Sequence, residues 1–317
     1  MIAARGEVMF SALLRMRQFL MRLGIFRAIR KVPLAYSAYA FLYRYLIPRN
    51  QLFVNAHGHK IFLDHRDMGM ARALLLSGGR WEETETRLFS CSVQRGMTVV
   101  DVGANVGYYT LLAARLVGDA GKVFAFEPSP ENFVLLERNV KANGYENVIL
   151  IPKAVSNESG TAELLIDHAS SGGHKLSRAG TGADSVEVET VSLDEYFANR
   201  GEQIDVLKID AEGAEMAILQ GMRDVLSRSS NLALLTEFSP QGIRDFGCLP
   251  EEYVKLLRVH GFRIYPVIEE QEKLRALDFE RVDDLVSSLA KGDSTSRSLN
   301  LFCLKGTRNP AFGESNS

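Results

Sequence analysis

The sequence predicts a Rossmann-like α/β protein built on a doubly wound sheet of seven mostly parallel strands. From Met97 onward, short apolar runs rich in β-branched residues alternate with amphipathic helical stretches. Such alternation is typical of repeated βα units on a parallel sheet. A glycine-containing turn also joins the first apolar run to a helix. Ligands of such sheets bind beyond the carboxyl ends of the strands, so we expect the functional residues there.

Seven strands and four main helices are predicted in the region from 97 to 305. The strand candidates are Thr98–Asp101, Lys122–Glu127, Val148–Pro152, Val206–Asp210, Leu232–Phe238, Phe262–Val267 and Leu301–Leu304. The helix candidates are Gly107–Leu116, Pro130–Asn143, Gly213–Leu226 and Pro250–His260. Residues 169–184 are rich in glycine and serine and lie between two strand-like pieces, so we predict a mobile loop.

Residues 1–50 form a basic amphipathic segment, which we predict to be a helical extension. This segment carries nine basic residues and one acidic residue, Glu7. Ser11, Arg15, Gln18 and Arg22 recur at helical spacing as a narrow polar stripe. Its longest uncharged run, 32–43, is shorter than the roughly 20 residues that span a bilayer. The extension therefore either contacts anionic membrane surfaces peripherally or caps the catalytic domain.

The remainder of the chain divides into a domain over 51–305 and a flexible tail over 306–317. Within the domain, residues 51–96 precede the catalytic sheet of 97–305. An alternating apolar and polar pattern around 51–64, with a central His-Gly pair, predicts a hairpin. The stretch 81–91 then predicts a helix.

The net charge limits the possible binding partners of the protein, and the cysteines limit its cellular compartment. The formal net charge is -2 and the pI about 6.3, so no basic field indicates nucleic acid as the partner. The three cysteines are widely spaced and form no CxxC pair, which indicates reduced thiols. No signal peptide is evident, because arginines interrupt every apolar stretch near the start. We expect a cytoplasmic protein, with peripheral membrane contact through residues 1–50 as the open alternative.

The turn after the first strand is the candidate cofactor site. The run VDVGANVGYYT places Asp101, Gly103, Asn105 and Gly107 between an apolar strand and a helix. Glycine allows positive φ and close backbone approach, and the helix start offers unpaired N–H groups. A dinucleotide site would have G-x-G-x-x-G here, whereas this turn reads D-x-G-x-N-x-G. The spacing favours S-adenosylmethionine over NAD, with Asp101 directed at the amino group of its methionine part.

The second candidate cofactor residue is Glu127, at the end of the next predicted strand and 20 residues after Gly107. A carboxylate at this position can accept hydrogen bonds from both ribose hydroxyls. The alternative is an acid favoured only by the dipole of the following helix.

These motifs together resemble the FkbM-type methyltransferases. The resemblance is carried by VDVGANVGYYT, FAFEPSPENFVLLERNVKANG, VSLDEYF, DVLKIDAEGAEMAILQGM and LLTEF, and covers roughly residues 51–305. It implies a class I S-adenosylmethionine-dependent methyltransferase fold and methyl transfer to an oxygen. In this family the acceptor is often a hydroxyl of a sugar, a glycolipid or a polyketide product. We therefore expect a small-molecule or glycan acceptor, and the resemblance does not identify it.

Candidate catalytic residues lie where the fourth and fifth predicted strands end. A hydroxyl acceptor needs a group near the methyl donor that orients it or removes its proton. Asp210 and Glu237 qualify by position, and Lys208 lies two residues before Asp210 on the same strand face. Lys208 and Asp210 either form a structural ion pair or act together on the acceptor. We expect Glu212 and Glu215 in the first turn of the next helix, where the dipole alone could explain them.

A metal site is left unassigned. The histidines show no ligand spacing such as HxxxH, so zinc is not indicated. A magnesium ion held by Asp210 and Glu237 is chemically reasonable, but two carboxylates far apart in sequence are weak evidence. His174, in the Ser/Gly-rich stretch, is either a solvated loop residue or a base that closes over the site.

Two other functions remain open at this stage. The first is an NAD(P)-dependent oxidoreductase, which the absence of G-x-G-x-x-G disfavours. The second is a regulatory module that binds the cofactor without catalysis.

Overall fold

The computed structural model describes most of the chain between residues 52 and 308. The described residues are Ala12, Met16, 52–177, 184–268, 274–278, 282–291 and 298–308. The predicted extension over 1–50 lies outside them, except for Ala12 and Met16, which are helical. Most of the predicted tail, 309–317, also lies outside them. Within the described part, no helix combines the length and the apolar character needed to cross a bilayer.

The chain divides into two compact units. The first runs to Trp81 and includes His168–Ser171, and the second holds Glu82–Asp167 and the chain from Gly172 onward. In the first unit, strands β1 (Phe53–Ala56) and β2 (His59–Phe62) form an antiparallel hairpin, followed by helix α4 (Met70–Ser77).

The hairpin turn and the start of α4 are both explained locally. His57 and Gly58 form the turn with φ values of 49° and 83°, the pair of positive angles that a tight two-residue hairpin turn requires. At the start of α4, Asp67 accepts hydrogen bonds from the backbone N–H groups of Gly69 and Ala71.

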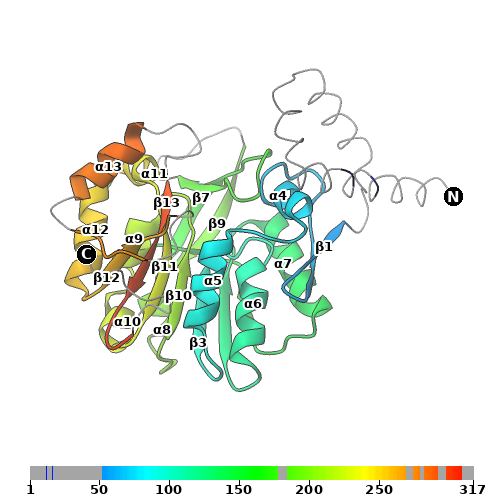
Figure 1. The fold of residues 1–317 in the computed structure, drawn as a ribbon, viewed down its shortest axis with the longest axis horizontal. Coiled ribbons are helices and arrows are strands. Elements are labelled where there is room, and N and C mark those ends of the chain that lie inside the picture. Colours follow the sequence, from blue (N-terminus) through cyan, green and yellow to red (C-terminus); the bar gives the residue numbers. More distant parts are fainter. Residues whose placement is uncertain are drawn as a thin grey trace. The chain divides into compact units, whose positions relative to one another are not determined.

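The second unit is built on a seven-stranded sheet, as the sequence predicts (Figure 1). Its strands are β3 (Thr98–Val102), β4 (Lys122–Phe126), β5 (Val148–Ile151), β10 (Val206–Ile209), β11 (Ala233–Phe238), β12 (Arg263–Pro266) and β13 (Leu299–Leu304). Their spatial order is β12-β13-β11-β10-β3-β4-β5, and β13 is antiparallel to both of its neighbours. The chain leaves β3 toward one edge and later returns beside it as β10. This reversal of strand order is the position where doubly wound sheets bind ligands.

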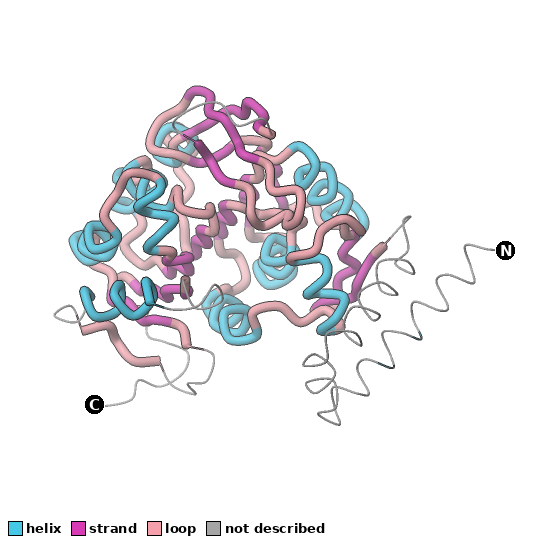
Figure 2. The backbone as a smooth tube through the Cα atoms, turned by 90° about the horizontal axis from the view of Figure 1, so that it is seen from above, coloured by secondary structure: helices cyan, strands magenta, loops and turns pink. Residues whose placement is uncertain are grey.

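Helices lie on both faces of this twisted sheet (Figure 2). The helices of the second unit are α5 (Glu83–Ser92), α6 (Tyr108–Val117), α7 (Pro130–Ala142), α8 (Leu193–Phe197), α9 (Glu215–Gln220), α10 (Arg223–Arg228), α11 (Pro240–Asp245), α12 (Pro250–Val259) and α13 (Val282–Lys291). Strands β3, β4 and β10 are buried almost throughout, because both of their faces are covered. Lys208 and Asp101 are the charged side chains buried in these strands.

The prediction of one continuous helix over 213–226 is wrong, because the structure has two short helices there. Helix α9 ends at Gln220 and is followed by Gly221, and α10 begins at Arg223. A Cβ on Gly221 would lie 2.3 Å from the backbone oxygen of Ser156. The close approach of this second segment explains why glycine stands at the break.

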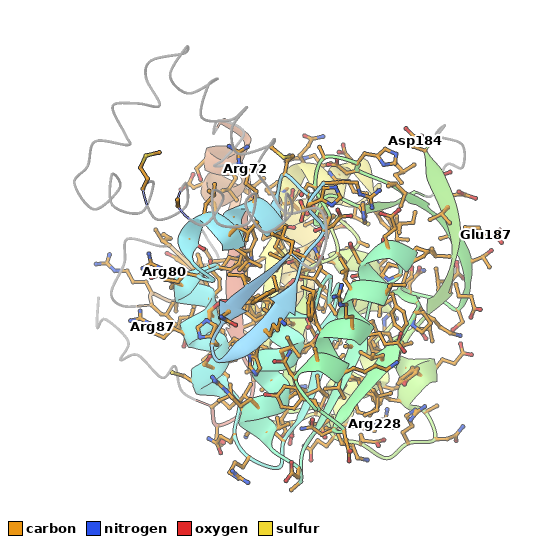
Figure 3. All side chains as sticks on the ribbon, turned by 90° about the vertical axis from the view of Figure 1, so that its right-hand side faces the viewer. Arg72, Arg80, Arg87, Asp184, Glu187 and Arg228 are labelled. Atoms are coloured by element: carbon orange, nitrogen blue, oxygen red, sulfur yellow. The ribbon has the colours of Figure 1, made fainter. Side chains whose placement is uncertain are left out.

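The predicted loop over 169–184 is also partly wrong. A second, four-stranded sheet has the order β6-β9-β7-β8, and β8 (Lys175–Ser177) falls inside the predicted loop. Its other strands are β6 (Ala154–Val155), β7 (Gly160–Leu165) and β9 (Ser185–Val191). Strand β8 is held by antiparallel pairing with β7, a long-range contact that local composition does not reveal. Asp184 and Glu187 project from the outer side of this sheet (Figure 3).

Candidate functional site

The turn from β3 into α6 brings the backbone against the neighbouring strand. Gly103 has a φ of 76°, and a Cβ there would lie 1.8 Å from the backbone oxygen of Asp210. Gly107 has a φ of 94°, and its Cβ would lie 2.7 Å from Cδ1 of Leu136. Gly103 is therefore required by this close backbone contact, and Gly107 by its positive φ, because Cδ1 is the movable end of the Leu136 side chain.

Asn105, between these glycines, adopts the left-handed conformation with a φ of 51°. Its backbone N–H donates to Oε2 of Glu127 at 2.7 Å. Its side-chain oxygen is shielded from solvent and has no hydrogen-bond partner among the described residues. A buried polar atom without a partner costs free energy, so this oxygen is a place where a bound ligand could donate a hydrogen bond.

Glu127 is held at the end of β4 by two backbone donors. The N–H of Ser129 donates to Oε1 at 2.9 Å, and the N–H of Asn105 donates to Oε2. The side chain is 4% exposed, and burial raises its pKa to about 7 despite these hydrogen bonds, which lower it. Each carboxylate oxygen has a further lone pair, so the group can still accept hydrogen bonds from ribose hydroxyls.

Asp101 lies deeper in the sheet than the other turn residues. It is 1% exposed, it pairs in register with Lys208 on β10, and its Oδ2 accepts a hydrogen bond from the Thr110 hydroxyl at 2.6 Å. Burial raises its pKa, and the positive charge of Lys208 opposes that shift. Lys208 is thus the charge partner of Asp101, and a contact between Asp101 and the cofactor stays a prediction.

Lys208 joins the cofactor turn to the end of β10. Its Nζ lies 2.9 Å from Oδ2 of Asp210 and 4.7 Å from the centre of the Tyr109 ring. Burial alone would lower its pKa, but the charges of Asp210, Asp101 and Glu82 outweigh this effect and raise the pKa above its ordinary value. The ion pair anticipated between Lys208 and Asp210 is therefore present, and the ammonium group stays charged.

Glu82 and Tyr109 complete this network and were not found by sequence reasoning. The hydroxyl of Tyr109 donates to Oε2 of Glu82 at 2.8 Å. Glu82 precedes α5 with a positive φ of 42°. Burial, together with repulsion from Asp210, raises its pKa to about 7. The residues are 27 positions apart, so no local pattern links them.

Three carboxylates meet at the carboxyl ends of β10 and β11, and we call them the acidic cluster: Asp210, Glu212 and Glu237. One oxygen of each lies within 4.8 Å of the others. Glu212 was expected in the first turn of a helix, which is wrong. It stands in a turn before α9 with a φ of 49°. That conformation directs its side chain to the cluster instead of to a helix end.

Glu215 lies in the first turn of α9, as expected, and is fully buried behind the acidic cluster. Its Oε1 accepts hydrogen bonds from the N–H groups of Ala211 and Gly213, at 3.2 and 3.1 Å. Burial raises the pKa of Glu212 and of Glu215 to about 7, and repulsion from Asp210 adds to both shifts. Burial and the same neighbouring charges raise the pKa of Glu237 well above its ordinary value.

His174 has a local structural role. Its Nδ1 accepts a hydrogen bond from the backbone N–H of Asp167 at 3.0 Å, just before β8. In the described part of the chain, the group of side chains suited to holding a metal ion is the acidic cluster, which contains only carboxylates.

The strand order and the glycine turn at its reversal define a class I Rossmann-like methyltransferase fold. The family model "Methyltransferase FkbM domain" matches residues 101–264, which include every candidate site residue proposed from the sequence. The chain belongs to this family of S-adenosylmethionine-dependent methyltransferases. A second model, for protein-L-isoaspartate(D-aspartate) O-methyltransferase, matches residues 47–154.

Among curated proteins, the chain is 31% identical over 182 residues to the hexuronic acid methyltransferase AglP from Haloferax volcanii. That alignment covers 56% of this chain and 68% of AglP. It is 29% identical over 177 residues to the methyltransferase sdnD from Sordaria araneosa, with 46% of this chain and 68% of that protein covered. A solved S-adenosylmethionine-dependent O-methyltransferase from Thermotoga maritima aligns with a TM-score of 0.38 and 14% identity, over 83% of this chain and 88% of that one.

Proposed function

We propose that this methyltransferase transfers its methyl group to a hydroxyl oxygen of a glycan, a glycolipid or a secondary metabolite. The observation that carries the proposal is the position of the acidic cluster. It lies at the end of β10, and the backbone of Asp210 there abuts the glycine turn of β3. A group that orients or deprotonates an acceptor must lie beside the methyl donor, and Asp210 has that position relative to the turn.

The turn and the end of β4 have the groups that S-adenosylmethionine needs. Glu127 would accept hydrogen bonds from the ribose hydroxyls, and the orphaned oxygen of Asn105 would accept one from the bound cofactor. Gly103 and Gly107 would give the turn the positive φ angles that bring its backbone to the cofactor at the start of α6. Asp101 would bind the methionine amino group from within β3. Its negative charge would at the same time be paired with the positive charge of Lys208 on β10.

The chemistry divides between the cofactor and the chain. When bound, S-adenosylmethionine supplies an electrophilic methyl group. Asp210 would orient the acceptor hydroxyl and take up its proton, while Lys208 holds the Asp210 carboxylate in place through their 2.9 Å ion pair. Glu237 would contact the acceptor from the adjacent strand. This assignment explains a lysine inside a buried strand, because Lys208 fixes two carboxylates at once.

The acceptor class follows from the relatives and is the least constrained part of the proposal. AglP is named for a hexuronic acid, and this supports a sugar acceptor here. Membership of the methyltransferase family also removes the NAD(P)-dependent oxidoreductase as an alternative. A module that binds the cofactor without catalysis is the alternative that the following experiment tests.

The experiment uses S-adenosylmethionine with a tritiated methyl group and the full chain. Extracted glycans, lipids and small metabolites are incubated separately, and labelled products are treated with alkali. A methyl ether formed on a hydroxyl survives alkali, whereas a methyl ester formed on a carboxylate releases methanol. We expect alkali-stable label that disappears with Asp210→Asn. Alkali-labile label, label only in protein or nucleic acid, or no label in any fraction would contradict hydroxyl methylation.

For residues 1–50, we propose peripheral contact with anionic membranes, on the basis of nine basic residues on an amphipathic segment. Flotation with vesicles containing anionic lipid should carry the full chain upward at low salt and release it at high salt. Failure to float at low salt would leave the segment as a cap on the domain.

A further inference from the structure

The acidic cluster has the geometry of a site for one small hard cation. Asp210, Glu212 and Glu237 come from the loop after β10 and from β11, and one oxygen of each lies within 4.8 Å of the others. Oxygen ligands around one divalent cation lie about 2.0–2.6 Å from it, so opposite ligands are about 4–5 Å apart. The three side chains can therefore reach a single ion without rearrangement of the backbone.

Glu237 provides an independent observation that points to a ligand at this site. Its Oε2 is shielded from solvent and has no hydrogen-bond partner among the described residues. The nearby amide of Asn300, its register partner on β13, donates instead to Glu85 at 3.3 Å. Ser298 hydrogen-bonds to the Glu237 side chain, but this leaves Oε2 without a donor. A shielded carboxylate oxygen without a donor, on a side chain grouped with two other carboxylates, is unfavourable unless a cation or a proton compensates its charge.

The charges around the cluster do not balance within the protein. Glu215 is fully buried behind it, and Asp167 adds a further negative charge near Glu212. The positive groups that face these acids are Lys208, which is shared between Asp210 and Asp101, and Lys175, which faces Glu212. Glu82 also faces Lys208, so seven carboxylates stand against these two lysines. An ion of charge +2 would compensate part of the excess negative charge.

We propose that the acidic cluster binds a divalent cation that prefers oxygen ligands, such as Mg²⁺ or Mn²⁺. Only carboxylates contribute, which suits hard ions and not Zn²⁺. Three protein ligands leave further coordination positions open. These positions would take two neighbouring oxygens of the acceptor, such as vicinal hydroxyls or a hydroxyl beside a carboxylate. This last step rests on the proposed function, whereas the cation site itself does not.

A bound cation would also explain how a cluster of carboxylates can bind an anionic sugar acceptor. Uncompensated carboxylates would repel an anionic sugar, and they would hold a neutral one only through hydrogen bonds. A bridging cation attracts acceptor oxygens of either kind and places them beside the glycine turn. As a ligand of the ion, Asp210 would then position the acceptor. The ion pair with Lys208 would fix the orientation of the Asp210 carboxylate.

The test measures Mn²⁺ binding to the full chain after chelator treatment and dialysis, by the loss of the free Mn²⁺ signal in electron paramagnetic resonance. We expect one saturable ion per chain, displaced by excess Mg²⁺. Glu237→Gln and Glu212→Gln should each weaken binding by roughly tenfold or more, because each removes one charged ligand. Glu189→Gln is the matched control, because Glu189 is exposed and paired with Lys153 on the other sheet. Its binding should equal that of the wild type.

Two variants and a folding check make the result decisive. The carboxyl group of Glu212 is less deeply enclosed than that of Glu237, so Glu212→Gln is expected to fold even where the other substitution does not. Thermal unfolding verifies both variants. Absence of a saturable Mn²⁺ site in the wild type, or equal affinity in Glu212→Gln, would overturn the proposal and leave shared protons as the occupants of the cluster. The measurement needs no acceptor, so a failure of methyl transfer would not affect it.

Discussion

The cofactor turn and the acidic cluster are adjacent, yet they differ in how their carboxylates are satisfied. At the turn, both oxygens of Glu127 accept backbone hydrogen bonds, and the glycines are fixed by contacts within the chain. At the acidic cluster, the oxygens face one another, and Oε2 of Glu237 has no donor among the described residues. The Glu127 carboxylate is therefore fixed by the chain itself, whereas Oε2 of Glu237 is not. The side-chain oxygen of Asn105 and Oδ1 of Asp101 are the atoms of the turn that lack a partner among the described residues.

This difference indicates that the cofactor site is held by contacts within the chain, whereas the acceptor site depends more on what binds there. A turn built from backbone contacts is rigid, so it suits a cofactor that is the same in every reaction cycle. An incompletely compensated cluster gains free energy when an ion or an acceptor binds, so it suits the variable part of the reaction. Substitutions at the turn should therefore act on folding and cofactor affinity. Substitutions at the cluster should act on turnover and ion binding.

The largest expected effect is that of Gly103→Ala. The added methyl carbon would lie 1.8 Å from the backbone oxygen of Asp210, and β3 and β10 each have a neighbouring strand on both sides in the sheet. We expect a loss of about 4 kcal/mol or more in the free energy of unfolding, an unusually large effect for one methyl group. Urea unfolding measures it.

Gly144→Ala is the matched control for this substitution. Gly144 also has a positive φ, of 73°, but its added Cβ would meet nothing within 4 Å. It should cost only the left-handed strain of about 1–2 kcal/mol. Equal losses in the two variants would show that strain, and not the contact between β3 and β10, makes Gly103 necessary.

The second expected effect is on turnover. Asp210→Asn keeps the shape of the side chain and removes its charge, so methyl transfer should fall by roughly 10²–10⁴-fold. If Asp210 serves only as the structural partner of Lys208, the same change should instead lower the melting temperature by leaving a buried ammonium group with less compensation. Single-turnover methylation and thermal unfolding of this one variant separate the two roles. Near wild-type turnover in a folded variant would eliminate the catalytic assignment.

The third expected effect is a pH dependence of stability that comes from Glu127. Its pKa is raised from 4.5 to about 7 by burial, so the folded state binds the proton more tightly than the unfolded state. Its contribution to stability is therefore complete below about pH 4.5 and is lost as the pH rises to about 7. The loss is up to about 3 kcal/mol.

Glu127→Gln cannot ionise, so the difference in unfolding free energy between wild type and variant should change across this pH window. Denaturant unfolding at several pH values measures it. Glu137→Gln is the control, because Glu137 is exposed and pairs with Lys141 on the surface of α7. Parallel stability curves for wild type and Glu127→Gln would show that burial does not raise the pKa of Glu127.

Much of the fold could be predicted from local pattern. All seven strands and the glycine turn were predicted, because buried parallel strands leave continuous apolar runs and positive φ selects glycine. Short elements were missed or misplaced. Helix α8 has five residues, and β8 has three and depends on pairing with β7. Such elements are fixed by long-range contacts that propensity does not contain.

The candidate site was predictable where strand ends alone determine position. Lys208, Asp210 and Glu237 were identified because parallel strands place their carboxyl ends at one edge. Glu82 was missed because it reaches Tyr109 from a separate helix start. Glu212 was assigned to the wrong element because its positive φ moves it out of the helix. A glutamate rarely adopts that conformation, so no sequence rule would have placed Glu212 in the cluster.

The central claim is that cofactor binding depends on the turn and not on the acidic cluster, and one calorimetric titration tests it directly. Adenosylhomocysteine is titrated into Glu127→Ala and Asp210→Asn in parallel with the wild type. Glu127→Ala should lose roughly 1–3 kcal/mol of binding free energy, because charge-assisted hydrogen bonds to the ribose are removed. Asp210→Asn should bind as the wild type does. Unchanged affinity in Glu127→Ala, or an equal loss in Asp210→Asn, would contradict the division between the two regions.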